Sequence, residues 1–454
     1  MKLPASLRKF VQAVTGKRHF ESAGGGSRWP MTVSMANPAR QALAARAVTA
    51  SRSSWLIANA PIAEAIVAGW GTHLVGDGPS ARSLHPNQGM ARALEGSWLG
   101  SFYNHASVDG QDLGSVLTAA ARALVGQGEA FYRMVTTDRG VRLQELHPDQ
   151  IDPSLNRETD GGGRIIAGIE FDAAGPRVRY WVRPSPDTVI GASAAIPVDA
   201  ADILHLYEQK WPGQVRGLSW LAPVATTIVE YDAALDAALT KLKTTALLCA
   251  FIKDLDGQST AAEDLAAEQP MEPGASVRLP PGLDVVFPPI SDMSSAEGFL
   301  KRMVQTIASG VGLPYEVLSS DYSQTNYSSS RLALQSFLRR CKAIRAGVLV
   351  AKMLRPFYER HVTVEILTGR INAPDFARNP QAFFDASWLW PAHASINPLD
   401  EAKATILLMQ AGITSRQAAI AETGRDPETV DAEIDSDTHA DMASNVTPIK
   451  NEAA

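Results

Sequence analysis

The stretch that decides the fold runs from residue 217 to residue 248 and reads GLSWLAPVATTIVEYDAALDAALTKLKTTALL. Apolar residues recur in it every seven positions, which predicts one apolar stripe along a single long helix. Small Ala and Thr residues cover most of the remaining surface, so neighbouring helices could approach closely. At about 1.5 Å per residue this helix would be about 45 Å long. The stripe consists of Leu221, Ile228, Leu235, Leu242 and Cys249.

A second helix is predicted at 292–312, after an excursion at 249–291 that contains short strand-like pieces. Ser294 followed by Glu297 is typical of a capping box at a helix start. Gly312 then ends the apolar repeat. The order is therefore helix, small β-containing segment and returning helix. The strand-like pieces are 251–253, 276–279 and 283–287.

The preceding region, 37–216, predicts a mixed α+β unit. Asn37 followed by Pro38 is a helix start signal, and helices are expected at 37–59, 62–71 and 111–125. Short runs rich in Val, Ile, Tyr and Phe follow, separated by Gly, Pro and Asp, which predicts an antiparallel, meander-like sheet. These runs are 130–135, 141–146, 165–171, 178–182 and 203–207.

The region after the second helix is unusually basic. A polar loop at 313–330 leads into a third helix at 331–355, which we expect to break at Pro356. Residues 331–360 hold eight basic residues and one acidic residue, Glu359. Two short helices are predicted at 398–411 and 414–423, the second capped by Thr414. The chain begins with a flexible basic arm, 1–36, and a disordered acidic tail is predicted at 426–454.

The composition is that of a folded protein with more than one structural unit. The chain has 454 residues, of which 45% are hydrophobic and 20% charged, and this length exceeds one compact core. The net charge of -6 gives no overall nucleic-acid signature. Cys249 and Cys341 are expected as buried thiols, which fits a reducing cytoplasm. No apolar run reaches the length of a membrane helix, so we expect no membrane partner.

The motifs of the common catalytic chemistries are missing from the sequence. There is no phosphate-binding loop that ends in Gly-Lys-Ser or Gly-Lys-Thr and no His-Glu-x-x-His pair. The two cysteines are 92 positions apart (341 − 249), which makes a zinc site improbable. We therefore expect no enzyme activity, no cofactor and no metal.

Several short motifs occur in a fixed order along the chain. They are Arg52-Ser53-Ser54-Trp55, Gly128-Glu129-Ala130-Phe131, Gln214-Val215-Arg216-Gly217-Leu218-Ser219-Trp220-Leu221 and Leu279-Pro280-Pro281-Gly282, and the strongest is Gly312-Leu313-Pro314-Tyr315-Glu316-Val317-Leu318 with the Asp321-Tyr322-Ser323 and Asn326-Tyr327-Ser328 that follow. Each motif alone is weak, but their order and spacing over 37–425 are specific. Together these segments resemble the lambda-type portal proteins of tailed bacteriophages.

The resemblance implies an α+β portal-type fold with an α/β wing, a two-helix stem, a small β-containing clip and a helical C-terminal crown. The basic arm and the acidic tail have no assigned role. The implied parts are a wing at 37–216 and 331–395, stem helices at 217–248 and 292–312, a clip at 249–291, a tunnel loop at 313–330 and a crown at 396–425.

The resemblance also implies a function. About twelve subunits would form a ring at one vertex of the capsid, through which double-stranded DNA is packaged and later ejected. The ring would bind the terminase large subunit, which supplies ATP hydrolysis, and later the head-tail connector and head-completion proteins. The major capsid and scaffold proteins would be further partners. The protein would be assembled in the bacterial cytoplasm and reside in the virion.

A channel that lets DNA slide should hold few and weak phosphate contacts, because every neutralised phosphate adds affinity. The alternative for the basic residues Arg339, Arg340 and Arg345 is pairing with acids of a neighbouring subunit. The candidate DNA contacts are Lys241, Lys243, Lys301, Arg302, Tyr322, Gln324, Asn326, Tyr327 and Arg331.

Two other classes of protein remain open at this point. A DNA-processing enzyme of a phage head would need clustered carboxylates or a nucleophile with its base. A head-tail connector or adaptor ring would be shorter and would lack the paired stem helices.

Overall fold

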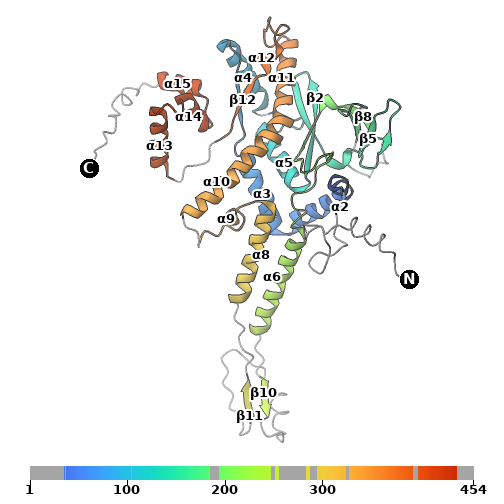
Figure 1. Cartoon of the computed structure of the whole chain (residues 1–454), viewed down its shortest axis with the longest axis vertical. Coiled ribbons are helices and arrows are strands. Elements are labelled where there is room, and N and C mark those ends of the chain that lie inside the picture. The colour runs from blue at the N-terminus through green and yellow to red at the C-terminus, as the bar shows by residue number, and fades with distance from the viewer. Residues whose placement is uncertain are drawn as a thin grey trace, which may run out of the picture.

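The computed structural model describes residues 35, 37–103, 105–184, 194–246, 251–254, 283–286, 294–323, 327–391 and 397–436. Two helices, α6 (Ala225–Ala246) and α8 (Ser294–Val311), project side by side from a mixed α/β body (Figure 1). A two-stranded hairpin lies beyond their far ends, and a small group of helices lies beside the body (Figure 1). None of the described helices is both long and apolar enough to cross a membrane.

Four helices build the first part of the body. The side chain of Asn37 accepts a hydrogen bond from the backbone N–H of Arg40, which confirms the predicted helix start. A fourth helix, α4, was not predicted. These helices are α2 (Pro38–Asn59), α3 (Pro61–Val75), α4 (Gln88–Phe102) and α5 (Leu113–Gly126).

The strands within residues 129–207 form two antiparallel sheets rather than one meander. In the first sheet, β2 (Glu129–Thr137) pairs with β3 (Gly140–Leu146) on one side and with β9 (Ile203–Tyr207) on the other. The predicted strand 165–171 is two strands, because Ala167 and Gly168 turn the chain with φ of 49° and 77°. The second sheet is β4 (Arg157–Glu158), β5 (Arg164–Ile166), β6 (Ile169–Phe171), β7 (Arg177–Val182) and β8 (Ile196–Asp199).

The basic segment forms one continuous helical rod, so the predicted break at Pro356 was wrong. Helix α10 (Tyr327–Ile344) passes into a π-helical stretch, η4 (Arg345–Leu354), and then into α11 (Arg355–Leu367). A proline ring clashes with the carbonyl four residues earlier in a regular α-helix. The wider turns of η4 lie directly before Pro356 and make room for that ring.

The two parts of the body share one hydrophobic core. Strand β1 (Ser80–Ser83) pairs with β12 (Ala386–Leu389), which follows the short helix α12 (Pro380–Phe384). Aromatic rings from both parts pack edge to face, with centroid distances of 5.0 Å between Trp70 and Phe337 and 5.4 Å between Trp98 and Phe357. Such pairs add to the free energy already gained from burying their apolar area.

A separate helical group follows the body. It consists of α13 (Pro398–Gln410), α14 (Arg416–Glu422) and α15 (Pro427–Ser436). Ser415 caps α14 by accepting from the N–H of Ala418, so Thr414 is not the cap. The expectation of a disordered tail was wrong for 427–436, and 437–454 lies outside the described residues.

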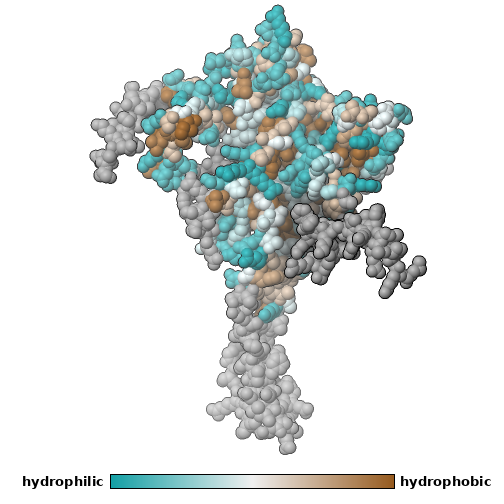
Figure 2. Space-filling view, in the orientation of Figure 1, coloured by the Kyte–Doolittle hydropathy of each residue, from teal (hydrophilic) through white to brown (hydrophobic). Residues whose placement is uncertain are grey.

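Pairing explains why this acidic end folds. Asp431 pairs with Arg416 and Glu433 pairs with Arg425, so basic residues at α14 and just after it neutralise the acids of α15. No residue of α13 is buried. Figure 2 shows hydrophobic residues gathered over this helical group, in which Leu399, Leu407 and Ile413 are 62%, 61% and 73% exposed.

Candidate nucleic-acid interface

The projecting helix pair is apolar and closely packed only near the body. Ile228 of α6 and Ile307 of α8 are fully buried there. A side chain at Gly310 would lie 2.3 Å from the Cγ1 of Val224, so glycine is what lets the two segments approach. Further out, Leu235 and Leu242 are 39% and 47% exposed. The predicted apolar stripe is therefore covered within the chain only over its first half.

The first projecting helix starts later than predicted. Residues 217–219 have no regular secondary structure, 220–224 form turns, and α6 begins at Ala225. A side chain at Gly217 would lie 2.1 Å from the carbonyl oxygen of Gly128, so this segment packs directly on the backbone before β2. Of the predicted strand-like pieces, 251–253 and 283–287 correspond to the antiparallel pair β10 (Phe251–Asp254) and β11 (Leu283–Val286). The piece 276–279 and Cys249 lie outside the described residues.

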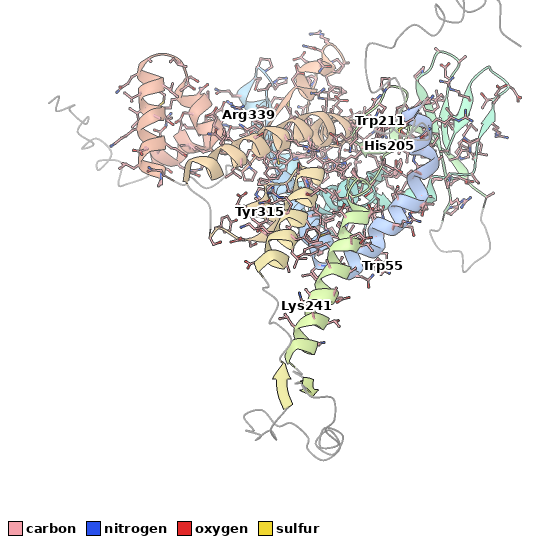
Figure 3. All side chains as sticks on the ribbon, turned by 60° about the horizontal axis from the view of Figure 1, so that its bottom comes forward. Trp55, His205, Trp211, Lys241, Tyr315 and Arg339 are labelled. Carbon is pink, nitrogen blue, oxygen red and sulfur yellow. The ribbon has the colours of Figure 1, made fainter. Side chains whose placement is uncertain are left out.

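Three of the predicted DNA contacts are exposed on the helix pair. Lys241 and Lys243 lie on the outer half of α6, and Figure 3 shows Lys241 well away from the body. Arg302 is exposed on α8. The fourth, Lys301, is half-buried because its ammonium lies 3.6 Å from the carboxylate of Asp321 and 5.5 Å from the ring centre of Tyr315.

The predicted loop 313–330 contains a short helix, α9 (Tyr315–Ser319), which ends at Ser320 in the left-handed conformation. Asp321 accepts hydrogen bonds from the backbone N–H and the hydroxyl of Ser323, and these bonds lower the pKa of Asp321 to about 2. Tyr322 beside it is 64% exposed. Gln324 and Asn326 lie outside the described residues. Tyr327 and Arg331 lie in the first turns of α10, and their side chains are outside the described part.

Much of the basic segment is used inside the chain, which the sequence did not reveal. The guanidinium of Arg345 donates to the carbonyls of Leu74 and His73 and stacks on Trp390. The guanidinium of Arg340 lies 5.1 Å from the ring centre of Trp70.

Two further cations of this segment are also engaged. The ammonium of Lys352 donates to the carbonyl of Tyr207 at 2.7 Å, and burial lowers the pKa of Lys352 to about 8. Arg360 pairs with Asp202 at 2.8 Å. Arg339, Lys342 and Arg355 are exposed.

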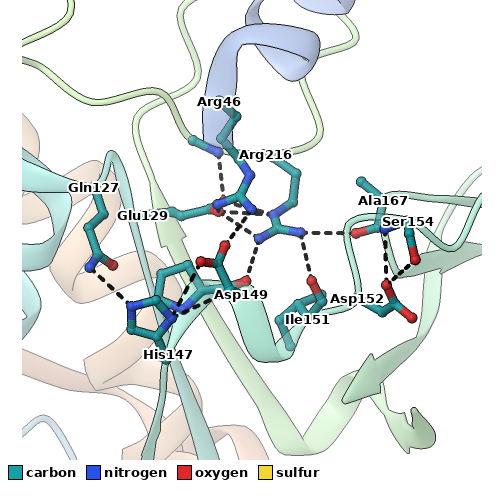
Figure 4. A network of polar contacts seen from close by, with 12 residues as sticks. Arg46, Gln127, Glu129, His147, Asp149, Ile151, Asp152, Ser154, Ala167 and Arg216 are labelled. Atoms are coloured by element: carbon teal, nitrogen blue, oxygen red, sulfur yellow. Dashed lines mark hydrogen bonds and ion pairs between the residues drawn. The ribbon is translucent and has the colours of Figure 1, made fainter. Parts of the chain in front are cut away.

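A buried polar network that the sequence analysis missed lies in the body, at the segment that leads into α6 (Figure 4). Glu129 is fully buried and accepts from Arg216 at 2.8 Å, from Arg46 at 3.1 Å and from the N–H of Gly217 at 2.7 Å. Arg216 also donates to the carbonyls of Pro148 and Ala167. The Glu129 carboxylate thus connects α2, the first sheet and the segment that leads into α6, and Arg216 extends the network to the turn between β5 and β6.

In this network Glu129 is ionised and His205 is neutral. Burial alone would raise the pKa of Glu129, but the charge of Arg216 and the hydrogen bond from His205 hold it well below its usual range. Burial lowers the pKa of His205 to about 3. His205 is therefore neutral, with Nε2 donating to Glu129 and Nδ1 accepting from Arg177 at 3.2 Å.

Comparison with known proteins identifies the class to which this arrangement belongs. Residues 27–345 match the family described as phage portal protein, lambda family. Because this match covers more than half of the chain, the protein belongs to the lambda family of phage portal proteins. The predicted family and the predicted portal-type α+β fold are confirmed.

The chain is similar to two curated portal proteins. It is 22% identical over 360 residues to portal protein B of Escherichia phage lambda, covering 71% of this chain and 67% of that protein. It is 23% identical over 321 residues to the portal protein of Escherichia phage N15, covering 62% of this chain and 60% of that protein. The alignments thus span about two thirds or less of the length of these relatives.

A solved structure supports the fold independently. The neck of an empty gene transfer agent particle contains a chain that is 17% identical and matches with a TM-score of 0.50, over 83% of this chain and 94% of that one. At this identity the likeness concerns the fold. Among the described residues there is no group of three or more His, Cys, Asp or Glu that could hold a metal ion.

Proposed function

We propose that this protein forms a ring of about twelve subunits at one capsid vertex and is the channel for double-stranded DNA during packaging and ejection. The observation that carries the proposal is the projecting helix pair α6–α8 in a chain of the portal family. In one subunit its outer half leaves Leu239 and Phe299 49% and 60% exposed. A closed ring, in which every subunit uses two different faces, would cover such side chains with those of its neighbours.

In this proposal the parts of the ring are those that the family resemblance implies. The helix pair is the stem, the β10–β11 hairpin belongs to the clip at 249–291, and the body formed by 37–216 and 331–395 is the wing. The segment 313–330 is the tunnel loop and the helices within 396–425 belong to the crown. The terminase large subunit, which would hydrolyse ATP, docks at the clip end and is later replaced by head-tail connector proteins. The capsid and scaffold proteins contact the wing.

The channel contacts DNA through a few weak cationic positions. Lys241, Lys243 and Arg302 are exposed and lie on the stem. Tyr322 and Gln324, with Asn326, Tyr327 and Arg331, add sequence-independent contacts at the tunnel loop, and Lys301 does so after releasing Asp321. No cofactor takes part. The protein resides in the virion after assembly in the host cytoplasm.

The stem contacts can be tested by replacing Lys241, Lys243 and Arg302 together with Gln. Because each contact is weak, we expect the rate of DNA packaging with the cognate terminase to fall about two- to threefold. The matched control replaces Arg157, Arg164 and Arg378, three exposed arginines of the wing, with Gln. A normal packaging rate in the stem variant would contradict the proposal that these residues contact DNA.

A further inference from the structure

The exposed cations of the basic segment converge on one groove. Arg339, Lys342 and Arg355 line a cavity of about 1020 Å³ between the α10–η4 rod and the helices α13 and α14. Trp388 and Trp390 form part of its wall. Figure 3 shows Arg339 on α10, with the C-terminal helices beyond it. The groove thus lies on the crown side of the tunnel loop, away from the stem.

Among the described residues, none of these three cations forms an ion pair, whereas Arg340, Arg345, Lys352 and Arg360 of the same rod are engaged. Burial raises the pKa of Glu359, one turn after Arg355 on α11, and the charge of Arg355 partly offsets this rise. A row of cations without ion-pair partners creates a positive potential that attracts anions.

The spacing of the cations selects the kind of anion. Arg339 and Lys342 are three positions apart and share one helix face, while Arg355 lies about 20 Å further along the rod. A single phosphate or a small metabolite cannot reach both ends of this row. An extended polyanion with regularly spaced charges can.

Within the described residues, the acidic helix α15 is a poor candidate for that polyanion. Asp431 and Glu433 of α15 are paired with Arg416 and Arg425, and Asp426 pairs with Arg82 at 3.0 Å. A neighbouring copy therefore offers few unpaired acids from this helix to the groove.

We infer that this groove is a second DNA-binding surface, on which the cations Arg339, Lys342 and Arg355 contact phosphates of the duplex outside the stem. The inference rests on the proposed function, which brings duplex DNA to this side of the ring. Across the groove, Glu422 lines the crown wall. Its negative charge limits how tightly a phosphate chain is held, so the surface guides DNA without stopping it.

The test measures duplex binding by the full chain in its assembled state, over a range of salt concentrations. The variant replaces Arg339, Lys342 and Arg355 with Gln. We expect binding to weaken at least about tenfold, and the slope of log affinity against log salt to become shallower by about 1 for each cation that meets a phosphate. The control replaces Arg40, Arg164 and Arg378 with Gln, which removes the same charge elsewhere and should leave binding near that of the unmodified protein.

A second variant removes a negative charge from the groove. Replacing Glu422 with Gln should tighten duplex binding and steepen its salt dependence, because the repulsion of phosphates is reduced. Unchanged affinity and salt slope in the three-cation variant would overturn the inference, as would polyglutamate binding more tightly than DNA. Native mass measured on the same samples separates the two ideas: rings with unaffected DNA binding contradict only the groove, whereas the absence of rings contradicts the proposed function.

Discussion

At the residue scale, the junction between the body and the α6–α8 helix pair depends on one buried carboxylate that satisfies several donors. Glu129 has no exposure, and removing its charge would leave Arg216 buried without an acidic partner and Arg46 paired only with Asp149. Losing one partner of a buried pair usually costs about 3–5 kcal/mol. Arg46, Glu129 and Arg216 are far apart in the sequence. The contacts among them could not be predicted from spacing, although the segments that hold Glu129 and Arg216 were among the motifs of the family resemblance.

Because His205 is neutral in the folded protein, the free energy of unfolding depends on pH. Its pKa in the folded protein is about 3, below the usual 6.5. The unfolded chain therefore takes up a proton as the pH falls below about 6.5, while the folded chain does not until about pH 3. The free energy of unfolding should fall over this window, by at most about 1.4 kcal/mol per pH unit from this group.

Urea unfolding at pH 6.5 and pH 5 checks this expectation. Replacing His205 with Gln keeps a donor for Glu129 and removes the titration, so the loss of stability between the two pH values should become smaller. His361, whose pKa burial lowers to about 4, is present in both proteins and cancels in the comparison. An equal loss in both proteins would show that His205 is not held neutral.

At the element scale, the sequence predicted the long helices well and their ends poorly. The apolar repeat located α6 and α8, but the start of α6 is set by the packing of Gly217 on Gly128, which no local pattern contains. Helix α4 has buried Leu94 and Trp98 at helical spacing, so its signal was present and overlooked. The straight passage through Pro356 depends on a π-helical stretch, which composition does not predict.

The contact between Gly128 and the segment before α6 gives an element-scale prediction. Gly128 has a φ of 90°, and an added Cβ would lie 2.1 Å from the carbonyl carbon of Leu218. Replacing Gly128 with Ala should therefore displace the segment that leads into the stem and lower stability by about 3 kcal/mol or more. Thermal unfolding measures the effect.

The matched control is Gly161, where an added Cβ has no neighbour within 4 Å. Replacing Gly161 with Ala should leave the unfolding temperature nearly unchanged. Similar unfolding temperatures for the two variants would mean that the stem is not anchored at Gly128.

At the scale of the whole molecule, the subunit is incomplete by itself. Its body has a continuous core, but the outer part of the α6–α8 pair and helix α13 keep apolar side chains in contact with water. The division into wing, stem, clip and crown, which the family resemblance implies, stays a prediction. Which cations face DNA could not be predicted, because half of the basic residues of 331–360 are used inside the chain, through contacts with Trp70, Leu74, Tyr207 and Asp202.

The central claim is that these subunits close into a channel-forming ring. Native mass spectrometry of the purified protein, with class averages from electron microscopy, tests it most directly. We expect particles of about twelve subunits with a central channel wide enough for duplex DNA, about 20 Å across. A stable monomer or twofold dimer under conditions where portal rings assemble would contradict the account.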